Sequence, residues 1–394
     1  MKIEFNTVIK NVSETTNHKV RQKIVDEFIR SKVKEVFPIF ETKEDVLFIY
    51  KGDGNPSIIG DMTNWERVIP YESINGTDLK FLRLRLDENA RLEYGIILDD
   101  PELISPDPFN LFVIWNGFGP HSELAMPGYK RNPIFNDYLY GEKGEIQGLI
   151  ELKSPKGALP YPHQVHVYLP PDYKGANRSY HSVYFQDGLD YVEFAVVPHL
   201  ITELIILGEI EPLVAVFVTP PNRYLQDMPN RMTEYGLNDN YVHFFTRELV
   251  PMIEKRFRVK NEPEKRLVVG DSFGGLISLY IAFRESNVFR LVYSQSGYHS
   301  FKDGQLINLF EQSPAKLIRI YNDVGLYEEK VGTGMLPDRE TDFLKANRDL
   351  YSVLKKKGYD VVYREYPEGH TWGNWRTHLI DALIHFFPGK NHEH

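Results

Sequence analysis

The stretch LVVGDSFGGLISLYIAF, residues 267–283, decides the fold. Three aliphatic residues lead into a glycine-rich turn around Ser272, and an apolar helical run follows it. Strand, tight turn and helix are the context in which a G-x-S-x-G pattern presents its serine as a nucleophile. Gly270 and Gly274 suit so sharp a turn because neither has a side chain to clash. The flanking strand and helix favour this interpretation over an ordinary glycine-rich turn with a surface serine.

A serine hydroxyl is a weak nucleophile and needs a neighbouring base, which a carboxylate orients. On sheets of this kind the three groups occur in the order serine, acid, histidine. His370 satisfies that order, since it stands after Gly369 on the turn that follows the last predicted strand, 361–366. We therefore expect His370 to be the general base of Ser272. The alternative is a surface histidine on a loop.

The acid should follow the strand predicted at 317–321. Glu328 stands just past the end of that strand, and Asp338 stands nearer the start of the next helical pattern. Either carboxylate could reach the histidine if the intervening segment folds back. We take Glu328 as the acid and keep Asp338 as the alternative.

Two backbone N–H groups are expected to form an oxyanion hole. One belongs to Phe273, at the start of the predicted helix. The other belongs to Leu189, which follows the turn residues Asp187 and Gly188 at the end of the strand predicted at 182–186. Asp-Gly is also a common turn dipeptide, so this second donor depends on the turn facing the serine.

Outward from these residues, the chain after residue 150 alternates short apolar runs with helical patterns. Such alternation predicts an α/β fold with a mostly parallel, doubly wound sheet and helices on both faces. The runs are 164–169, 182–186, 213–218, 266–269, 291–294, 317–321 and 361–366. Ligand chemistry on such a sheet belongs at the carboxyl ends of the strands.

The front of the chain has a different pattern. Apolar residues at helical spacing predict an amphipathic helix over 18–35, and short alternating runs between 46 and 98 predict a β-sandwich. We expect residues 1–145 to hold the helix, the sandwich and a linker. Residues 146–390 should form the catalytic domain.

Composition narrows the class of function. The chain of 394 residues has no cysteine, which excludes disulfides, thiolate nucleophiles and sulfur-ligated zinc. A net charge of −9 without a basic run disfavours nucleic acid. No stretch reaches the ~18 apolar residues of a membrane span, and the N-terminus lacks a signal-peptide core. We expect a cytoplasmic protein, or a secreted one that has lost its export signal, without metal, organic cofactor or membrane partner.

Four segments together resemble one family. They are YFQDGL at 184–189, GDSFGG at 270–275, SQSG at 294–297, and GHTW at 369–372 with Trp375 after it. They resemble the esterase family of α/β-hydrolases that includes enterochelin esterases, feruloyl esterases, esterase D and mycolyltransferases. The resemblance covers about residues 150–388 and implies an α/β-hydrolase fold. In relatives a Gly-x-x-acid pattern supplies the triad carboxylate, which maps to Glu328 in GLYE at 325–328.

The segment IGDMTNW at 59–65 resembles the turn of early-set immunoglobulin-like domains, the front domain of enterochelin esterases. The resemblance implies that this domain shapes the substrate site, acts as a lid or contacts glycan. The resemblance and the predicted triad together indicate a serine carboxylic-ester hydrolase with an acyl-enzyme intermediate, enterochelin esterase-like or feruloyl esterase-like. Its substrate would be a small-molecule or glycan-linked ester.

The residues expected to contact that substrate are Asp187, Gly188, Arg231, Trp372 and Trp375. Arg231 suits an anionic substrate, unless it forms an ion pair within its own segment, NRMTE at 230–234. Two other functions use the same sequence features. One is acyl transfer to an alcohol or sugar acceptor, and the other is glycan binding or scaffolding by an inert hydrolase domain.

Overall fold

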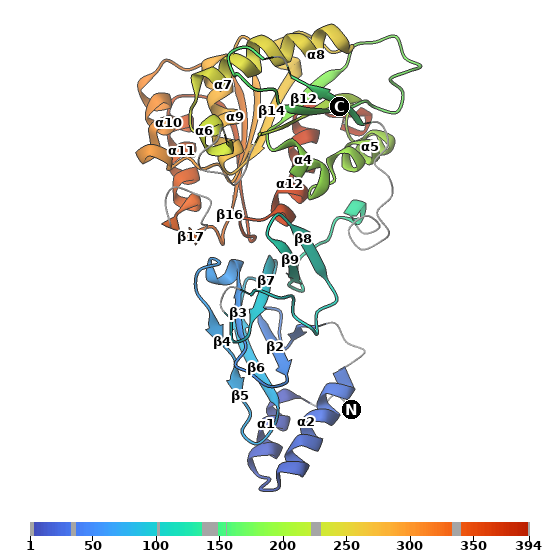
Figure 1. The fold of residues 1–394 in the computed structure, drawn as a ribbon, viewed down its shortest axis with the longest axis vertical. Coiled ribbons are helices and arrows are strands. Elements are labelled where there is room, and N and C mark those ends of the chain that lie inside the picture. Colours follow the sequence, from blue (N-terminus) through green and yellow to red (C-terminus); the bar gives the residue numbers. More distant parts are fainter. Residues whose placement is uncertain are drawn as a thin grey trace. The chain divides into compact units, whose positions relative to one another are not determined.

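The computed structural model describes residues 4–32, 37–100, 103–135, 149–154, 156–221, 230–332 and 340–392. The chain forms two compact units (Figure 1). The first comprises the residues up to Arg131 together with Pro367–Gly369, and the second comprises Asn132–Tyr366 and the residues from His370 onward. The domain boundary predicted at residue 145 lies outside the described residues.

The second unit is built on one sheet of eight strands, in the order β10-β11-β13-β12-β14-β15-β16-β19. The strands from β13 to β19 in that order run parallel, and β10 and β11 pair antiparallel at one edge. Their bounds are β10 Leu149–Lys153, β11 Gln164–Tyr168, β12 His181–Phe185, β13 Leu213–Thr219, β14 Arg266–Asp271, β15 Leu291–Gln295, β16 Arg319–Gly325 and β19 Asp360–Tyr366. The predicted mostly parallel α/β sheet is confirmed.

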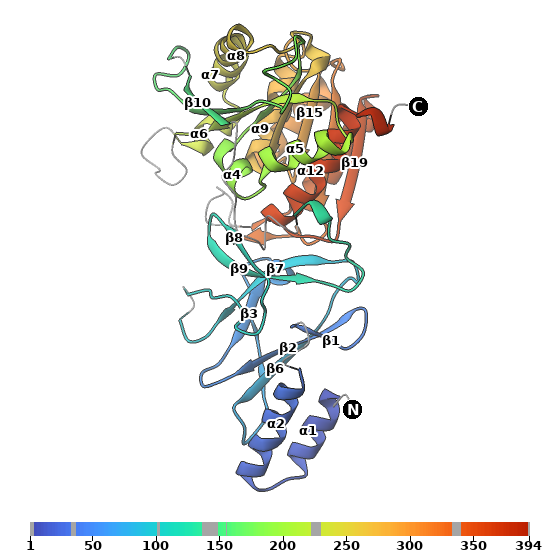
Figure 2. The same ribbon diagram turned by 90° about the vertical axis from the view of Figure 1, so that its right-hand side faces the viewer.

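Helices cover both faces of this sheet (Figure 2). The helical segments are α4 Gly188–Glu193, α5 Val197–Leu207, α6 Arg231–Tyr235, α7 Asp239–His243, the π-helical turn Phe244–Leu249, α8 Val250–Arg256, α9 Phe273–Arg284, α10 Phe301–Gln312, α11 Phe343–Lys356 and α12 Trp372–Phe386. A short two-stranded sheet pairs β17 Val331–Gly332 with β18 Glu340–Thr341.

Side chains of the central strands alternate between two hydrophobic cores. In β13, Val214, Val216 and Val218 belong to the core that α8, α9, α10 and α11 share, whereas Ala215 and Phe217 belong to the core under α4, α5 and α12. Strands buried on both faces have few polar positions, so the polar residues at their carboxyl ends stand out as functional.

The first unit holds two helices and two antiparallel sheets, in the orders β1-β2-β6-β5 and β4-β3-β7-β9-β8. Their bounds are α1 Phe5–Ser13, α2 His18–Lys32, β1 Ile39–Phe40, β2 Asp45–Lys51, β3 Ser57–Gly60, β4 Ile69–Pro70, β5 Glu72–Ser73, β6 Leu79–Arg85, β7 Arg91–Ile97, β8 Val113–Asn116 and β9 Gly119–Ala125. The predicted helix and antiparallel β domain are both present.

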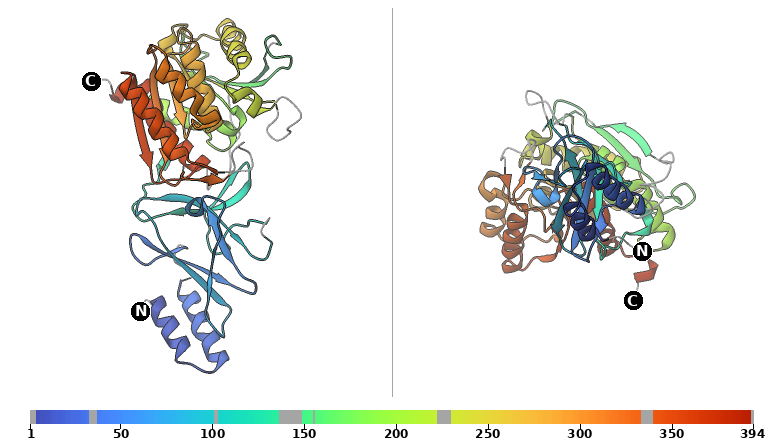
Figure 3. Two further views of the ribbon diagram at one scale, coloured as in Figure 1. Left: turned by 90° about the vertical axis from the view of Figure 1, so that its left-hand side faces the viewer. Right: turned by 90° about the horizontal axis from the view of Figure 1, so that it is seen from below.

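Helices α1 and α2 lie side by side at the first sheet (Figure 3). Val8 and Phe28 of the two helices are buried in one cluster with Leu47 and Phe81 of the sheet. Helix α1 was not predicted, although Phe5, Val8 and Val12 have helical spacing. Within the described ranges, no helix has the length and apolar character needed to cross a bilayer.

Candidate active site

Ser272 stands on a sharp turn between β14 and α9. Its backbone has φ 53° and ψ −116°, a region that residues with side chains rarely adopt. A Cβ on Gly270 would lie 2.3 Å from the carbonyl carbon of Gly274, so the turn closes only because position 270 is glycine. Strain of this kind clusters at functional sites. The observed strand, turn and helix are those predicted from the sequence.

Hydrogen bonds hold this turn against the next strand. The N–H of Ser272 donates to the carbonyl of Gln295 at 2.8 Å, and the N–H of Tyr298 donates to the carbonyl of Ser272 at 2.9 Å. Gln295 is the last residue of β15, and Tyr298 lies three residues beyond it; β15 pairs in parallel with β14. The serine backbone is therefore fixed on both sides of its α-carbon.

Three side chains selected from the sequence meet at this edge of the sheet. Nε2 of His370 lies 3.0 Å from Oγ of Ser272, and Nδ1 of the same ring lies 2.7 Å from Oε2 of Glu328. Glu328 is fully buried, Ser272 is 6% exposed, and the His370 side chain is 11% exposed. This is the hydrogen-bonded order of nucleophile, base and acid in a catalytic triad. Asp338, the alternative acid, lies outside the described residues.

The second oxygen of Glu328 is also occupied. Oε1 accepts hydrogen bonds from Oγ of Ser296 at 2.6 Å and from the N–H of Gly325 at 2.7 Å. Nε1 of Trp375 in turn donates to Oγ of Ser296 at 3.0 Å. A buried carboxylate is tolerable when such donors surround it. Ser296 lies in the SQSG segment at 294–297, and its contact with the acid was not predicted.

Aromatic rings flank the imidazole of His370. The ring centroid of Phe343 lies 4.2 Å from that of His370, and Trp375 meets it edge-on at 4.9 Å. Packing on two sides restricts rotation of the ring between its two hydrogen-bond partners. Phe343 is the first residue of α11, and its N–H donates to the carbonyl of Glu328 at 3.1 Å.

The two backbone N–H groups expected to bind an oxyanion differ in their hydrogen-bond acceptors. Phe273 is the first residue of α9, so its N–H has no acceptor within the helix. The N–H of Leu189 donates to Oγ1 of Thr219 at 3.2 Å, a bond that was not predicted. The sequence could not indicate this bond, because Thr219 ends a different strand.

The residues expected to contact a substrate are largely buried in the structure. Arg231 forms a buried ion pair, but its partner is Asp187 and not a residue of the segment 230–234. Trp372 and Trp375 are 6% and 5% exposed and pack in the core under α12. A Cβ on Gly188 would lie 2.4 Å from the backbone of Phe217, so this glycine serves close packing. Their exposed fractions are close to the 6% of Ser272, so contact of these residues with a substrate stays a prediction.

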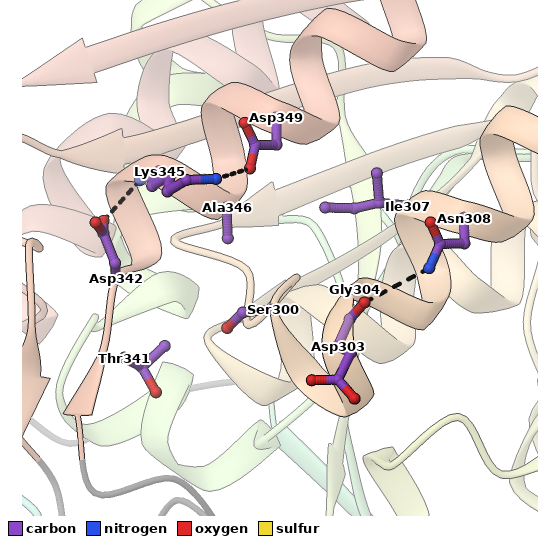
Figure 4. Close-up of a pocket in the computed structure, with 10 residues that line it drawn as sticks. All are labelled: Ser300, Asp303, Gly304, Ile307, Asn308, Thr341, Asp342, Lys345, Ala346 and Asp349. Atoms are coloured by element: carbon purple, nitrogen blue, oxygen red, sulfur yellow. Dashed lines mark hydrogen bonds and ion pairs between the residues drawn. The ribbon is translucent and has the colours of Figure 1, made fainter.

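A polar pocket of about 540 Å³ lies between the first turns of α10 and α11 (Figure 4). Three carboxylates line it, from Asp303, Asp342 and Asp349, with Lys345 as the one cation among its lining residues. Lys345 pairs with Asp349, and Asp342 caps α11 through the N–H of Lys345. The excess of carboxylates disfavours an anionic ligand here. No group of metal-ligating side chains occurs anywhere in the described part of the chain.

A serine on a strand–helix turn, with an acid and a histidine on loops at the same edge of a mostly parallel sheet, defines the α/β-hydrolase class. Within that class, the chain belongs to the family described as "Putative esterase", whose profile matches residues 157–386. The predicted family is confirmed.

The chain is also similar to individual curated proteins. The chain is 29% identical to an uncharacterised protein of Bacillus subtilis, YjcH, over 55% of this chain and 88% of that protein. It is 25% identical to the iron(III) enterobactin esterase of Escherichia coli K12, over 42% of this chain and 41% of that enzyme.

Solved structures extend the likeness to the whole fold. The crystal structure of ferric enterobactin esterase from Salmonella typhimurium superposes with a TM-score of 0.73 at 18% identity, covering 88% of this chain and 95% of that one. The enterobactin esterase of Shigella flexneri gives a TM-score of 0.70 at 21% identity, covering 88% and 94%. Both likenesses show that the α/β-hydrolase fold with an antiparallel β domain before it is shared.

Proposed function

We propose that this protein hydrolyses carboxylic esters, with Ser272 as nucleophile, His370 as general base and Glu328 as the acid that orients it. The observation that carries the proposal is the continuous hydrogen-bonded chain through these three side chains, at 3.0 and 2.7 Å. Membership of the esterase family supports the reaction class.

The distances support a two-step reaction. Nε2 of His370 takes the hydroxyl proton as Oγ of Ser272 attacks the ester carbonyl, and a tetrahedral oxyanion forms. Glu328 stabilises the imidazolium through Nδ1. His370 then gives the proton to the departing alcohol, which leaves an acyl-enzyme. A water molecule, deprotonated by His370, attacks the acyl carbon. As the second oxyanion collapses, the bond to Oγ of Ser272 breaks and His370 returns the proton to Oγ, which releases the acid and restores the Ser272 hydroxyl.

The oxyanion needs backbone donors that are already in place. We assign the N–H of Phe273 to this role, because it opens α9 next to the nucleophile and the positive end of the helix dipole adds to it. We keep the N–H of Leu189 as the second donor. It would exchange the hydroxyl of Thr219 for the more strongly accepting oxyanion when that charge develops.

The proposed substrate is a small-molecule ester. Three proteins named above are enterobactin esterases, so esters of catecholate siderophores belong in a substrate screen. Feruloyl sugars and short acyl esters complete that screen, because a solved feruloyl esterase has a TM-score of 0.50 with this chain. Acyl transfer is distinguished from hydrolysis by adding an alcohol acceptor and analysing whether the product is a new ester or the free acid.

The test is Ser272→Ala measured with p-nitrophenyl acetate. Triad members act as a unit, so we expect kcat to fall by at least about a thousandfold. Ser278→Ala is the matched control, since Ser278 is a fully buried serine in α9, the helix that follows Ser272. A fluorophosphonate probe should label the wild type and Ser278→Ala but not Ser272→Ala. Wild-type turnover by Ser272→Ala would refute the proposal.

A further inference from the structure

Arg231 forms a two-pronged ion pair with Asp187. Nε of Arg231 donates to Oδ1 of Asp187 and Nη2 donates to Oδ2, each at 2.7 Å. Arg231 is 7% exposed and Asp187 is 1% exposed. A planar guanidinium that engages both oxygens of a carboxylate fixes its orientation as well as its position.

The backbone of Asp187 is held by the same short helix. Asp187 has φ 49°, in the left-handed region, and its N–H donates to the hydroxyl of Tyr235 at 2.9 Å. Arg231 and Tyr235 begin and end α6. On the other side, a Cβ on Gly274 would lie 3.1 Å from Oδ2 of Asp187, so this carboxylate packs directly on α9. The turn after β12 is thus fixed through both its side chain and its main chain.

The same guanidinium also reaches the nucleophile turn. Nη2 of Arg231 donates to the carbonyl of Asp271 at 3.3 Å, and it lies 3.8 Å from Oδ2 of that residue. Asp271 immediately precedes Ser272 in the chain. One side chain therefore joins the turn that follows β12 to the turn that carries the serine.

Charge keeps this connection intact. Burial by itself lowers the pKa of a guanidinium, but the carboxylates of Asp187 and Asp271 outweigh burial and raise the pKa of Arg231 above its ordinary value. Arg231 consequently stays protonated over the working range of an enzyme and keeps all its donors.

We propose that Arg231 is a positioning residue for ester hydrolysis: it holds the turn after β12 and the turn at Ser272 in fixed register. The nucleophile and the backbone donors on these turns then face the same ester carbonyl. Arg231 acts through Asp187 and Asp271 and does not touch the substrate. This inference rests on the proposed function, and it replaces the substrate-binding role expected from the sequence.

The experiment compares Arg231→Met with Arg231→Lys, using kcat and KM for p-nitrophenyl acetate well below the unfolding temperature. Losing the alignment of an oxyanion donor lowers kcat about a hundredfold. We therefore expect a decrease of that order in kcat for Arg231→Met, with KM within about twofold of the wild-type value. Arg231→Lys keeps the charge but cannot engage two oxygens and a carbonyl in one plane, so about a tenfold loss is expected.

Arg266→Met is the matched control. Arg266 is 2% exposed and ion-paired with Glu254, but it starts β14, at the end of the strand opposite Ser272. We expect this variant to lose stability and to keep kcat. Equal losses of kcat in Arg231→Met and Arg266→Met at equal destabilisation would overturn the inference, as would wild-type kcat in folded Arg231→Met.

If Arg231→Met does not fold, Asp187→Asn tests the same connection with an almost unchanged shape. It should lower kcat at constant KM, and combined with Arg231→Lys its effect should be clearly less than additive. Additive losses, or unchanged kcat, would overturn the inference. Ser272→Ala is run in parallel: if it stays active, the proposed function fails, whereas an inactive Ser272→Ala beside a fully active Arg231→Met refutes only the role of Arg231.

Discussion

Glu328 illustrates how a carboxylate can serve from a fully buried position. Its two oxygens accept hydrogen bonds from His370, Ser296 and the backbone of Gly325. Without such donors, burying a charged group would cost several kcal/mol. The donor from Ser296 is itself fixed by Trp375. Ser296 and Gly325 therefore help to orient His370 through Glu328, without a hydrogen bond to the imidazole ring.

His299 gives the second unit a pH-dependent stability. The residue is fully buried, with Nε2 3.1 Å from Oγ of Ser294, and burial lowers its pKa to about 3. In the unfolded chain a histidine titrates near 6.5. Because the pKa is lower in the folded state, the stabilisation is complete above about pH 6.5 and is lost progressively toward about pH 3.

We therefore expect the free energy of unfolding to fall by about 2 kcal/mol between about pH 7.5 and about pH 5 through His299 alone. Urea unfolding of wild type and His299→Gln at both pH values measures this contribution, since other titrating groups are common to both proteins. The variant should show a smaller decrease. An identical decrease in the two proteins would mean that His299 is not kept neutral.

At the scale of elements, the turn between β14 and α9 leaves no room for side chains. A Cβ on Gly270 would lie 2.3 Å from both the carbonyl carbon and the oxygen of Gly274. We expect Gly270→Ala to destabilise the protein by about 3 kcal/mol and to abolish most activity, because the helix would have to shift relative to the strand. Thermal unfolding and p-nitrophenyl acetate turnover measure the two effects.

Gly175→Ala is the corresponding control on an exposed turn. The nearest atom to a Cβ at position 175, the carbonyl oxygen of Asp172, lies 4.0 Å away. We expect a change within about 1 kcal/mol and full activity. If Gly270→Ala behaved like this control, the result would contradict the close approach of β14 and α9 beside Ser272.

On the scale of the whole molecule, each unit has a hydrophobic core of its own. Phe28 is 1% exposed and belongs to the core that α1 and α2 form with the first sheet. Phe310 is fully buried in a core of the second unit. Removing either ring should cost about 3 kcal/mol or more.

Calorimetry of Phe28→Ala and Phe310→Ala tests this division. We expect Phe28→Ala to lower the unfolding transition of the first unit and Phe310→Ala to lower that of the second. The two variants are matched, because each removes one buried phenylalanine ring. A single transition shifted equally by both substitutions would contradict the expectation that the two units unfold separately.

Much of this protein follows from the chain itself. The alternation of apolar runs and helical patterns was sufficient for the parallel sheet, because strands buried on both faces need continuous apolar residues. The positions of Ser272 and His370 were also predictable, since turns at the carboxyl ends of parallel strands gather at one edge. Helix α1 was missed, although its spacing was visible in the sequence.

Other features depended on contacts between distant residues. The sequence left Glu328 and Asp338 both open as the acid, and only the folded loop places the Glu328 carboxylate 2.7 Å from His370. The partners of Arg231, Leu189 and Trp375 were likewise undecided, because whether a polar group faces a ligand or another buried group depends on which elements pack beside it. Local geometry is encoded in adjacent residues, whereas the satisfaction of buried polar groups is settled only when the whole chain has folded.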